Sequence, residues 1–184
     1  MAQHRGEVDR LRKNLSPVLQ QVLGSGGGEY EPSFAFAEHE LRRLLGGWTV
    51  TQHEIGGQSY LDLFRARQAP TLMPDSATYT AVYIFKRQLC LKRVRIEGFL
   101  ERDGTGLDFL YTMAVALSWE VGAPGQLRAV PEIGYQSSRI GGAPAGVSEL
   151  SLAAAAQISI AYRFEGDDLI FQEGEDSKRL RRDA

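Results

Sequence analysis

The chain has 184 residues, of which 43% are hydrophobic and 24% charged, the balance of a protein that buries an apolar core. Its formal net charge is -2, from 21 basic and 23 acidic side chains. This charge argues against a nucleic-acid polymer as partner, because proteins that bind one carry a basic domain or stripe. Cys90 is the only cysteine, so no disulfide can form within the chain, which favours a reducing compartment.

Residues 1–24 have the pattern of a helical arm, with apolar residues at helical spacing over 5–23 and Gly24 as a suitable helix end. Residues 25–37 predict a flexible linker, because they are rich in glycine and contain a turn-prone proline. The apolar stripe of the arm packs either on its own domain or on a second copy or a partner protein. The charged N-terminus predicts no secretory signal, and no apolar run is long enough for a membrane span, so we expect a cytoplasmic protein.

Residues 38–184 predict one domain, in which a short helix at 38–45 is followed almost entirely by β-strands. The strands are expected at 47–55, 58–66, 78–88, 90–102, 107–115, 118–121, 126–130, 155–165, 169–173 and 178–182. Glycine-rich turns separate them at spacings of about 8–12 residues, which is typical of an antiparallel barrel or sandwich. We therefore expect a mainly β fold, an antiparallel up-and-down β-barrel of about 8–10 strands, because closing the sheet removes its exposed edges.

Two parts of this domain are less regular. The strand at 118–121 continues the alternation of 107–115, after a bulge. Residues 131–152 contain Pro131, Gly134 and several further glycines, so they predict either a mobile lid or a long crossing.

The stretch Glu38–Val50, EHELRRLLGGWTV, carries a resemblance to known proteins. A short helix that leads into Gly46-Gly47-Trp48 resembles the Gly-x-Trp motif at the first strand of lipocalin-like (calycin) barrels. The SWEV…GQL hairpin at 118–127, the segment YRFEGDDLIF at 162–171 and a basic last strand resemble the bacterial, intracellular type.

This resemblance implies that Gly46 and Trp48 belong to a plug at the closed end of the barrel. In the family, an arginine from a late strand lies across the tryptophan. The candidates here are Arg163, which we assign to this role, Arg179 and Arg181, although the sequence itself does not separate the three. The missing signal peptide departs from the secreted lipocalins.

No catalytic signature is present, and we expect neither a metal site nor a cofactor. The three histidines, His4, His39 and His53, do not form the tight groups that metal sites use. Cys90 has no histidine at an informative spacing and predicts a buried structural thiol.

Aromatic and cationic side chains give the best functional signal. On alternating strand faces they would line a barrel cavity, where rings stack on a flat ligand and an arginine holds an anionic group. The predicted ligand-binding residues are Tyr83, Phe85, Arg87, Tyr111, Met113, Trp119 and Tyr162. Equally, these rings would fill a solid barrel. A basic cluster is either a solvated face or an attractor for an anion; it comprises Lys86, Arg87, Lys92, Arg93 and Arg95.

The sequence thus favours a non-catalytic barrel that binds or senses a small hydrophobic or aromatic ligand, either neutral or anionic, for which a signalling nucleotide is one candidate. The alternative is an interaction or assembly protein that uses residues 5–23 to form homo-oligomers or to dock a partner. An enzyme of the barrel-isomerase kind has only fold analogy in its favour.

Overall fold

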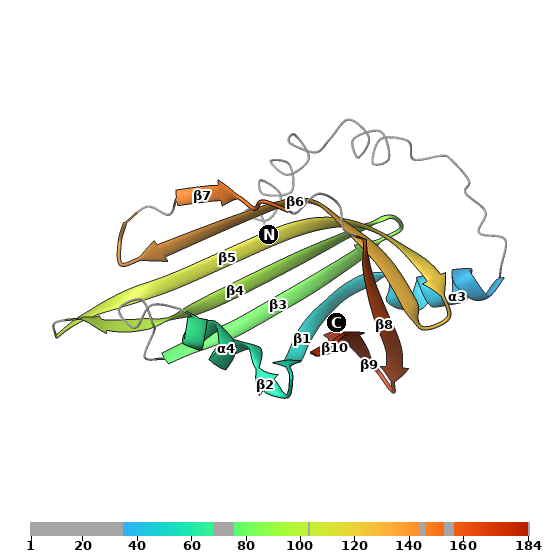
Figure 1. Ribbon diagram of the computed structural model, residues 1–184, viewed down its shortest axis with the longest axis horizontal. Coiled ribbons are helices and arrows are strands. Elements are labelled where there is room, and N and C mark those ends of the chain that lie inside the picture. The colour runs from blue at the N-terminus through green and yellow to red at the C-terminus, as the bar shows by residue number, and fades with distance from the viewer. Residues whose placement is uncertain (1–34, 68–75, 103, 144–145, 153–156, 184) are drawn as a thin grey trace. The chain divides into compact units, whose positions relative to one another are not determined.

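The computed structural model describes residues 35–67, 76–102, 104–143, 146–152 and 157–183 (Figure 1). The chain divides into two units, Met1–Ala35 and Phe36–Ala184, and the second is the one described below. The predicted arm at 1–24 and residues 25–34 of the predicted linker lie outside the described residues. The last part of that linker, 35–37, instead belongs to the first described helix. No helix in the described ranges is long and apolar enough to cross a membrane.

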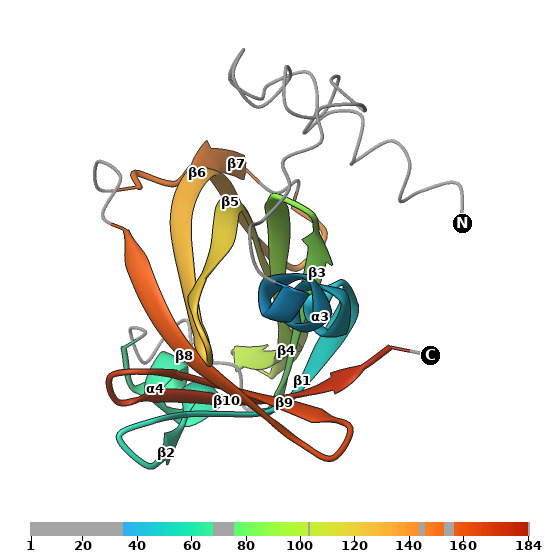
Figure 2. The same cartoon turned by 90° about the vertical axis from the view of Figure 1, so that its right-hand side faces the viewer.

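Eight antiparallel strands form a closed ring, which confirms the predicted barrel (Figure 2). Each strand pairs with its neighbours in the order β1-β3-β4-β5-β6-β8-β9-β10, and β10 pairs with β1 to close the sheet. The strands are β1 Gly46–Ile55, β3 Ser76–Lys86, β4 Leu89–Arg102, β5 Thr105–Ala123, β6 Gln126–Ile140, β8 Ile158–Glu165, β9 Asp168–Glu173 and β10 Asp176–Arg182. Two short strands lie beside the ring, β2 (Gln58–Ser59) against β1 and β7 (Gly146–Glu149) against β6.

Helix α3, Ala35–Leu44, leads into Trp48 at one end of the barrel, as the sequence predicts. The Trp48 side chain is 2% exposed, and its indole Nε1 donates a hydrogen bond of 2.8 Å to the carbonyl oxygen of Leu44. Carbonyls at a helix C-terminus have no partner within the helix, so this bond satisfies one of them. Trp48 therefore joins the helix to the barrel core.

The arginine over Trp48 is Arg182, and this corrects the assignment of Arg163. The Arg182 guanidinium carbon lies 4.7 Å from the Trp48 ring centroid, and the same group donates to the carbonyls of Arg43 and Leu45 at the end of α3. The three earlier candidates form ion pairs with acidic side chains on the outside of the barrel instead; they are Arg163, Arg179 and Arg181. Alternation explains the difference, because Arg182 shares a strand face with the fully buried Leu180.

The strand predicted at 58–66 is wrong beyond its first two residues, because Tyr60–Arg67 forms helix α4. Tyr60, Leu61 and Phe64 pack against the core from this helix, at the i, i+1 and i+4 spacing of one helical face. A short apolar run of this kind fits a strand pattern almost equally well.

The expected irregularity of 131–152 is also wrong for its first half, because β6 continues to Ile140. Pro131 lies at a bulge, where Leu117 pairs with Pro131 and Ala116 with Ile133, and a proline is tolerated there because it need not donate to the ladder. Gly134 admits Leu150, since a Cβ at this glycine would lie 2.8 Å from the Leu150 Cδ1 atom. The predicted bulge thus exists, but its extra residue belongs to β6, and 107–121 is part of one strand, β5.

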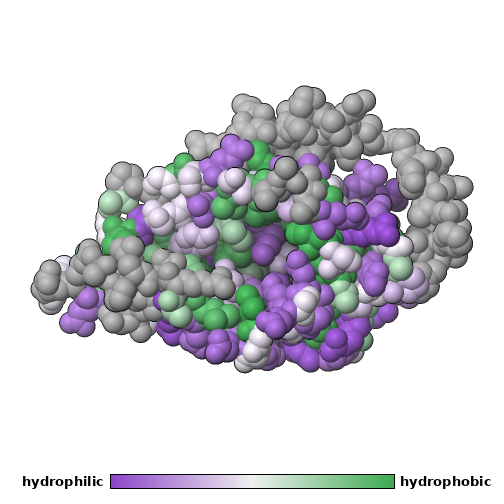
Figure 3. All heavy atoms as spheres, in the orientation of Figure 1, coloured by the Kyte–Doolittle hydropathy of each residue, from purple (hydrophilic) through white to green (hydrophobic). Residues whose placement is uncertain are grey.

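The strands differ greatly in length, and this opens one side of the barrel. β5 has 19 residues and β6 has 15, whereas β9 has 6. β8 pairs with β6 only over 126–129, and β7 pairs with β6 only over 135–138. β6 and β8 are therefore not paired beyond Ala129, and Figure 3 shows a hollow in this view in which hydrophobic and hydrophilic surfaces meet.

Candidate ligand site in the barrel interior

A group of polar side chains faces the barrel interior from β1, β3, β4 and β10. We call it the interior cluster; it consists of His53, Tyr79, Lys92, Asp176 and Lys178. Tyr79, Lys92, Asp176 and Lys178 share their strand faces with core residues such as Ala81, Val94 and Leu180 by alternation. In β1, a bulge between Val50 and Gln52 brings His53 to the same face as Val50. His53 and Lys178 are buried, at 8% and 5% exposure. Buried ionisable groups at such positions require partners or a function.

His53 links an aspartate to a tyrosine. Its Nε2 lies 3.0 Å from Asp176 Oδ1, and its Nδ1 lies 2.8 Å from the Tyr79 hydroxyl. Because an ionised carboxylate only accepts hydrogen bonds, Nε2–H is the donor, and a neutral His53 then accepts the Tyr79 O–H at Nδ1. Burial lowers the pKa of His53, which agrees with this neutral form, although the hydrogen bond to Asp176 works in the opposite direction.

Helix α4 packs against the hydrogen-bonded residues His53 and Tyr79. The Tyr60 ring stacks on His53 at 4.3 Å between centroids and 7° between planes, and it also contacts Tyr79. One turn later, Phe64 contacts the rings of Phe109 and Tyr111. α4 therefore covers part of the inner face beyond the ring, where β3–β6 extend past the short strands (Figure 1).

The interior cluster contains two lysines and one carboxylate, and only one of the lysines pairs with it. Lys178 Nζ donates to Asp176 Oδ1 at 2.5 Å. Burial by itself would raise the pKa of Asp176, but the hydrogen bonds from His53 and Lys178 outweigh it and bring that pKa to about 2. Lys92 has no ion-pair or hydrogen-bond partner among the described residues, and its Nζ lies 5.9 Å from the Tyr83 ring centroid. With both lysines protonated, the interior carries an excess positive charge.

The pKa of His53 predicts a pH-dependent stability. Since this pKa is below the ordinary value of 6.5, the unfolded chain takes up a proton before the folded chain does as the pH falls. The free energy of unfolding should therefore fall between about pH 7 and pH 5. Denaturant unfolding of wild type and His53→Gln over this range measures the effect, and the variant should lose less stability. Equal losses in the two proteins would contradict a neutral, buried His53.

Most of the predicted ligand-binding residues lie in the core. Tyr83, Phe85 and Trp119 come together with Phe171, with ring centroids 5.0–6.2 Å apart, and all four rings are buried. The Trp119 indole donates to the carbonyl oxygen of Lys86 at 2.8 Å. These rings fill the barrel at this level.

The remaining predicted residues are separated from that aromatic group. Tyr162 is buried, and its hydroxyl donates to Glu40 Oε2 at 3.1 Å. Tyr111 and Met113 are partly buried on the inner face of β5, and the Tyr111 hydroxyl donates to Gln136 at 3.2 Å. Arg87 is exposed in the turn between β3 and β4.

Sequence reasoning placed Lys92 in a basic cluster with Arg93 and Arg95 and did not single out the acidic partner of His53. The two arginines are exposed, whereas Lys92 faces inward. The signal was present in β4, where Lys92, Val94 and Ile96 alternate with the charged residues Arg93, Arg95 and Glu97. Cys90 is buried, as predicted, and burial raises the pKa of its thiol.

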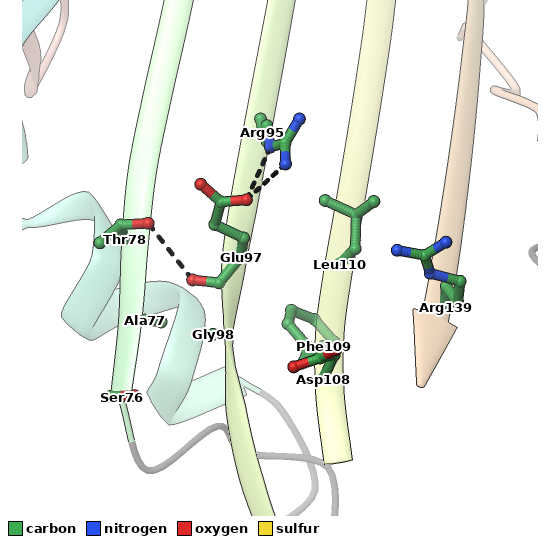
Figure 4. A pocket seen from close by; sticks show the side chains of 10 residues that line it. All are labelled: Ser76, Ala77, Thr78, Arg95, Glu97, Gly98, Asp108, Phe109, Leu110 and Arg139. Carbon is green, nitrogen blue, oxygen red and sulfur yellow. Dashed lines mark hydrogen bonds and ion pairs between the residues drawn. The ribbon is translucent and has the colours of Figure 1, made fainter. Parts of the chain in front are cut away.

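A groove of about 500 Å³ lies on the outer face of β3–β6 (Figure 4). Arg95 donates from Nε to Glu97 at 2.9 Å, and Arg139 and Asp108 also line the groove, so its charges balance. It is open to solvent and contains no partnerless buried group among the described residues. The interior is therefore the stronger candidate.

Comparisons with known proteins add no identification, because no protein-family model, no curated protein and no solved structure matches this chain.

Proposed function

We propose that the barrel is a non-catalytic binding or sensing module for a small ligand with an anionic group and a flat, apolar body. One observation carries this proposal. In its protonated form Lys92 places a positive charge in the interior, and no acidic side chain in the described ranges forms an ion pair with it. A charge held away from water without a partner is unfavourable, so an anion bound at Lys92 would stabilise the folded protein.

The surroundings of Lys92 define the rest of the ligand. Tyr83 lies beneath the ammonium group, and Tyr60, Tyr79 and Met113 supply further apolar surface on the inner face. Such mixtures of aromatic walls and a few polar groups are typical of small-molecule sites. An aromatic carboxylate, sulfonate or phosphate meets these requirements, and a signalling nucleotide is one member of this class.

The proposal includes kinship with lipocalin-like (calycin) barrels of the bacterial intracellular type. The closed eight-strand ring, the helix before Trp48 and the arginine across its indole support it. The single cysteine supports a cytoplasmic location. Partner docking through residues 5–23 stays a prediction, since those residues lie outside the described part of the chain.

Anilinonaphthalene sulfonate, an anionic aromatic dye, is a suitable probe. It should bind the folded protein with a rise in dye fluorescence and energy transfer from the buried Trp119. Lys92→Met should weaken binding, because the methionine keeps most of the side-chain length and removes the charge. Lys86→Met is the matched control, since Lys86 ends β3 with an exposed side chain. Equal binding by both variants would contradict the proposed site, provided that circular dichroism shows both to be folded.

A further inference from the structure

The chain uses lysine sparingly and in an unusual place. Its 21 basic residues comprise 17 arginines and only four lysines: Lys13, Lys86, Lys92 and Lys178. Two of the four face the barrel interior, whereas the strands' outward ion pairs use arginine. The two residue types differ in one decisive respect, because arginine stays charged in proteins while lysine can become a neutral amine when buried.

The surroundings of Lys92 make the neutral amine easier to reach from the ammonium form that would bind an anion. Burial lowers the pKa of Lys92, and the neighbouring charge of Lys178 lowers it further. Lys178 itself forms an ion pair with Asp176 at 2.5 Å. A desolvated lysine beside a second cation is a recognised arrangement for an amine nucleophile. Cys90, the other nucleophile on this face of β4, stays a thiol because burial raises its pKa.

We propose that Lys92 captures apolar aldehydes covalently, its Nζ forming an imine with the carbonyl carbon inside the barrel. The inference rests on the proposed function, since the same interior receives the ligand, and it adds a covalent bond. The Nζ lone pair attacks the carbonyl carbon and one amine hydrogen passes to the oxygen, which gives a carbinolamine. The hydroxyl then leaves with the second amine hydrogen as water, and a carbon–nitrogen double bond remains. No oxidant or reductant takes part.

The interior suits the product as well as the reaction. A conjugated aldehyde presents a flat body to the Tyr83 ring and to the partly buried Tyr111 and Met113. A protonated imine is a cation, and Asp176 and Glu173 both favour positive charge at Lys92. Limited access of water would slow hydrolysis of the bond.

Naphthaldehyde with sodium cyanoborohydride tests the inference on the full chain. The aldehyde is apolar and aromatic, and the borohydride reduces an imine to a stable amine. Intact-mass analysis counts the adducts, and peptide mapping assigns them among the four lysines and the N-terminus. We expect one adduct to form first, at Lys92, at least about tenfold faster than at the exposed Lys86.

Lys92→Arg separates this inference from the proposed function, because arginine keeps the positive charge but cannot form the imine. We expect the variant to retain the dye and to lose the fast adduct, while Lys86→Arg keeps both. Adducts spread over the exposed amines of wild type would overturn the covalent inference, and dye binding in the same sample would leave the proposed function standing. If the folded wild-type protein bound no dye and formed no adduct, both the covalent inference and the proposed function would be overturned.

Discussion

Replacing Trp48 by alanine is expected to lower the free energy of unfolding by about 3–5 kcal/mol, the range for truncating a large buried aromatic side chain. Trp48 is among the largest fully buried side chains of the described residues. Its ring contacts the Arg182 guanidinium and the Phe164 ring, whose centroid lies 6.1 Å from that of Trp48. The change also removes the donor for the Leu44 carbonyl and the surface on which Arg182 lies. Helix α3 and the closed end of the barrel should loosen together.

Chemical denaturation of wild type, Trp48→Ala and Trp48→Phe measures this loss. Phenylalanine keeps an aromatic ring and removes the indole donor, so its loss should be clearly smaller than that of alanine. Hydrogen exchange at α3 should accelerate in Trp48→Ala. A loss below about 1 kcal/mol for alanine would contradict a structural plug at this position.

Replacing Asp176 by alanine should lower the free energy of unfolding by about 3 kcal/mol, the low end of the range for removing one partner of a buried ion pair. Lys178 is 5% exposed and would keep its charge in the interior without a partner. His53 would lose its contact with the Asp176 carboxylate, which lies 3.0 Å from Nε2. The unpaired charge of Lys178 and the lost hydrogen bond of His53 would both destabilise the interior cluster.

The double variant Asp176→Ala/Lys178→Met is the control for this argument. It removes the unpaired charge, so it should recover at least half of the stability that Asp176→Ala loses. Denaturant unfolding of the two single variants and the double variant completes the cycle. A double variant as unstable as the sum of the singles would mean that Asp176 and Lys178 are not energetically coupled.

The parts of this fold that depend on short-range pattern are predicted well. The turn from α3 into Trp48, most hairpins and the closed antiparallel sheet follow from alternation and glycine-rich turns. Segments with ambiguous periodicity are not. Tyr60–Arg67 fits both a strand and a helix, and only its packing against His53 and Phe109 favours the helix.

The interior cluster depends on sheet register, which the sequence does not reveal. His53 and Asp176 are 123 residues apart and meet because β10 closes the barrel against β1. The inward position of Lys92 could have been predicted from alternation, since Val94 and Ile96 lie on the same strand face and are buried. The same reasoning from the buried Leu180 could have predicted that Arg182 lies on the face of β10 that carries core residues. In both cases the alternation of the strand was a better guide than the grouping of like charges.

The central claim is that protonated Lys92 binds the anionic group of a small ligand in the barrel interior. The dissociation constants of Lys92→Met and Lys86→Met for anilinonaphthalene sulfonate test it most directly. A charge-assisted contact contributes about 1.5–3 kcal/mol, so the constant for Lys92→Met should exceed that for Lys86→Met by about tenfold or more. Equal constants in two folded variants would place the dye elsewhere and contradict the account.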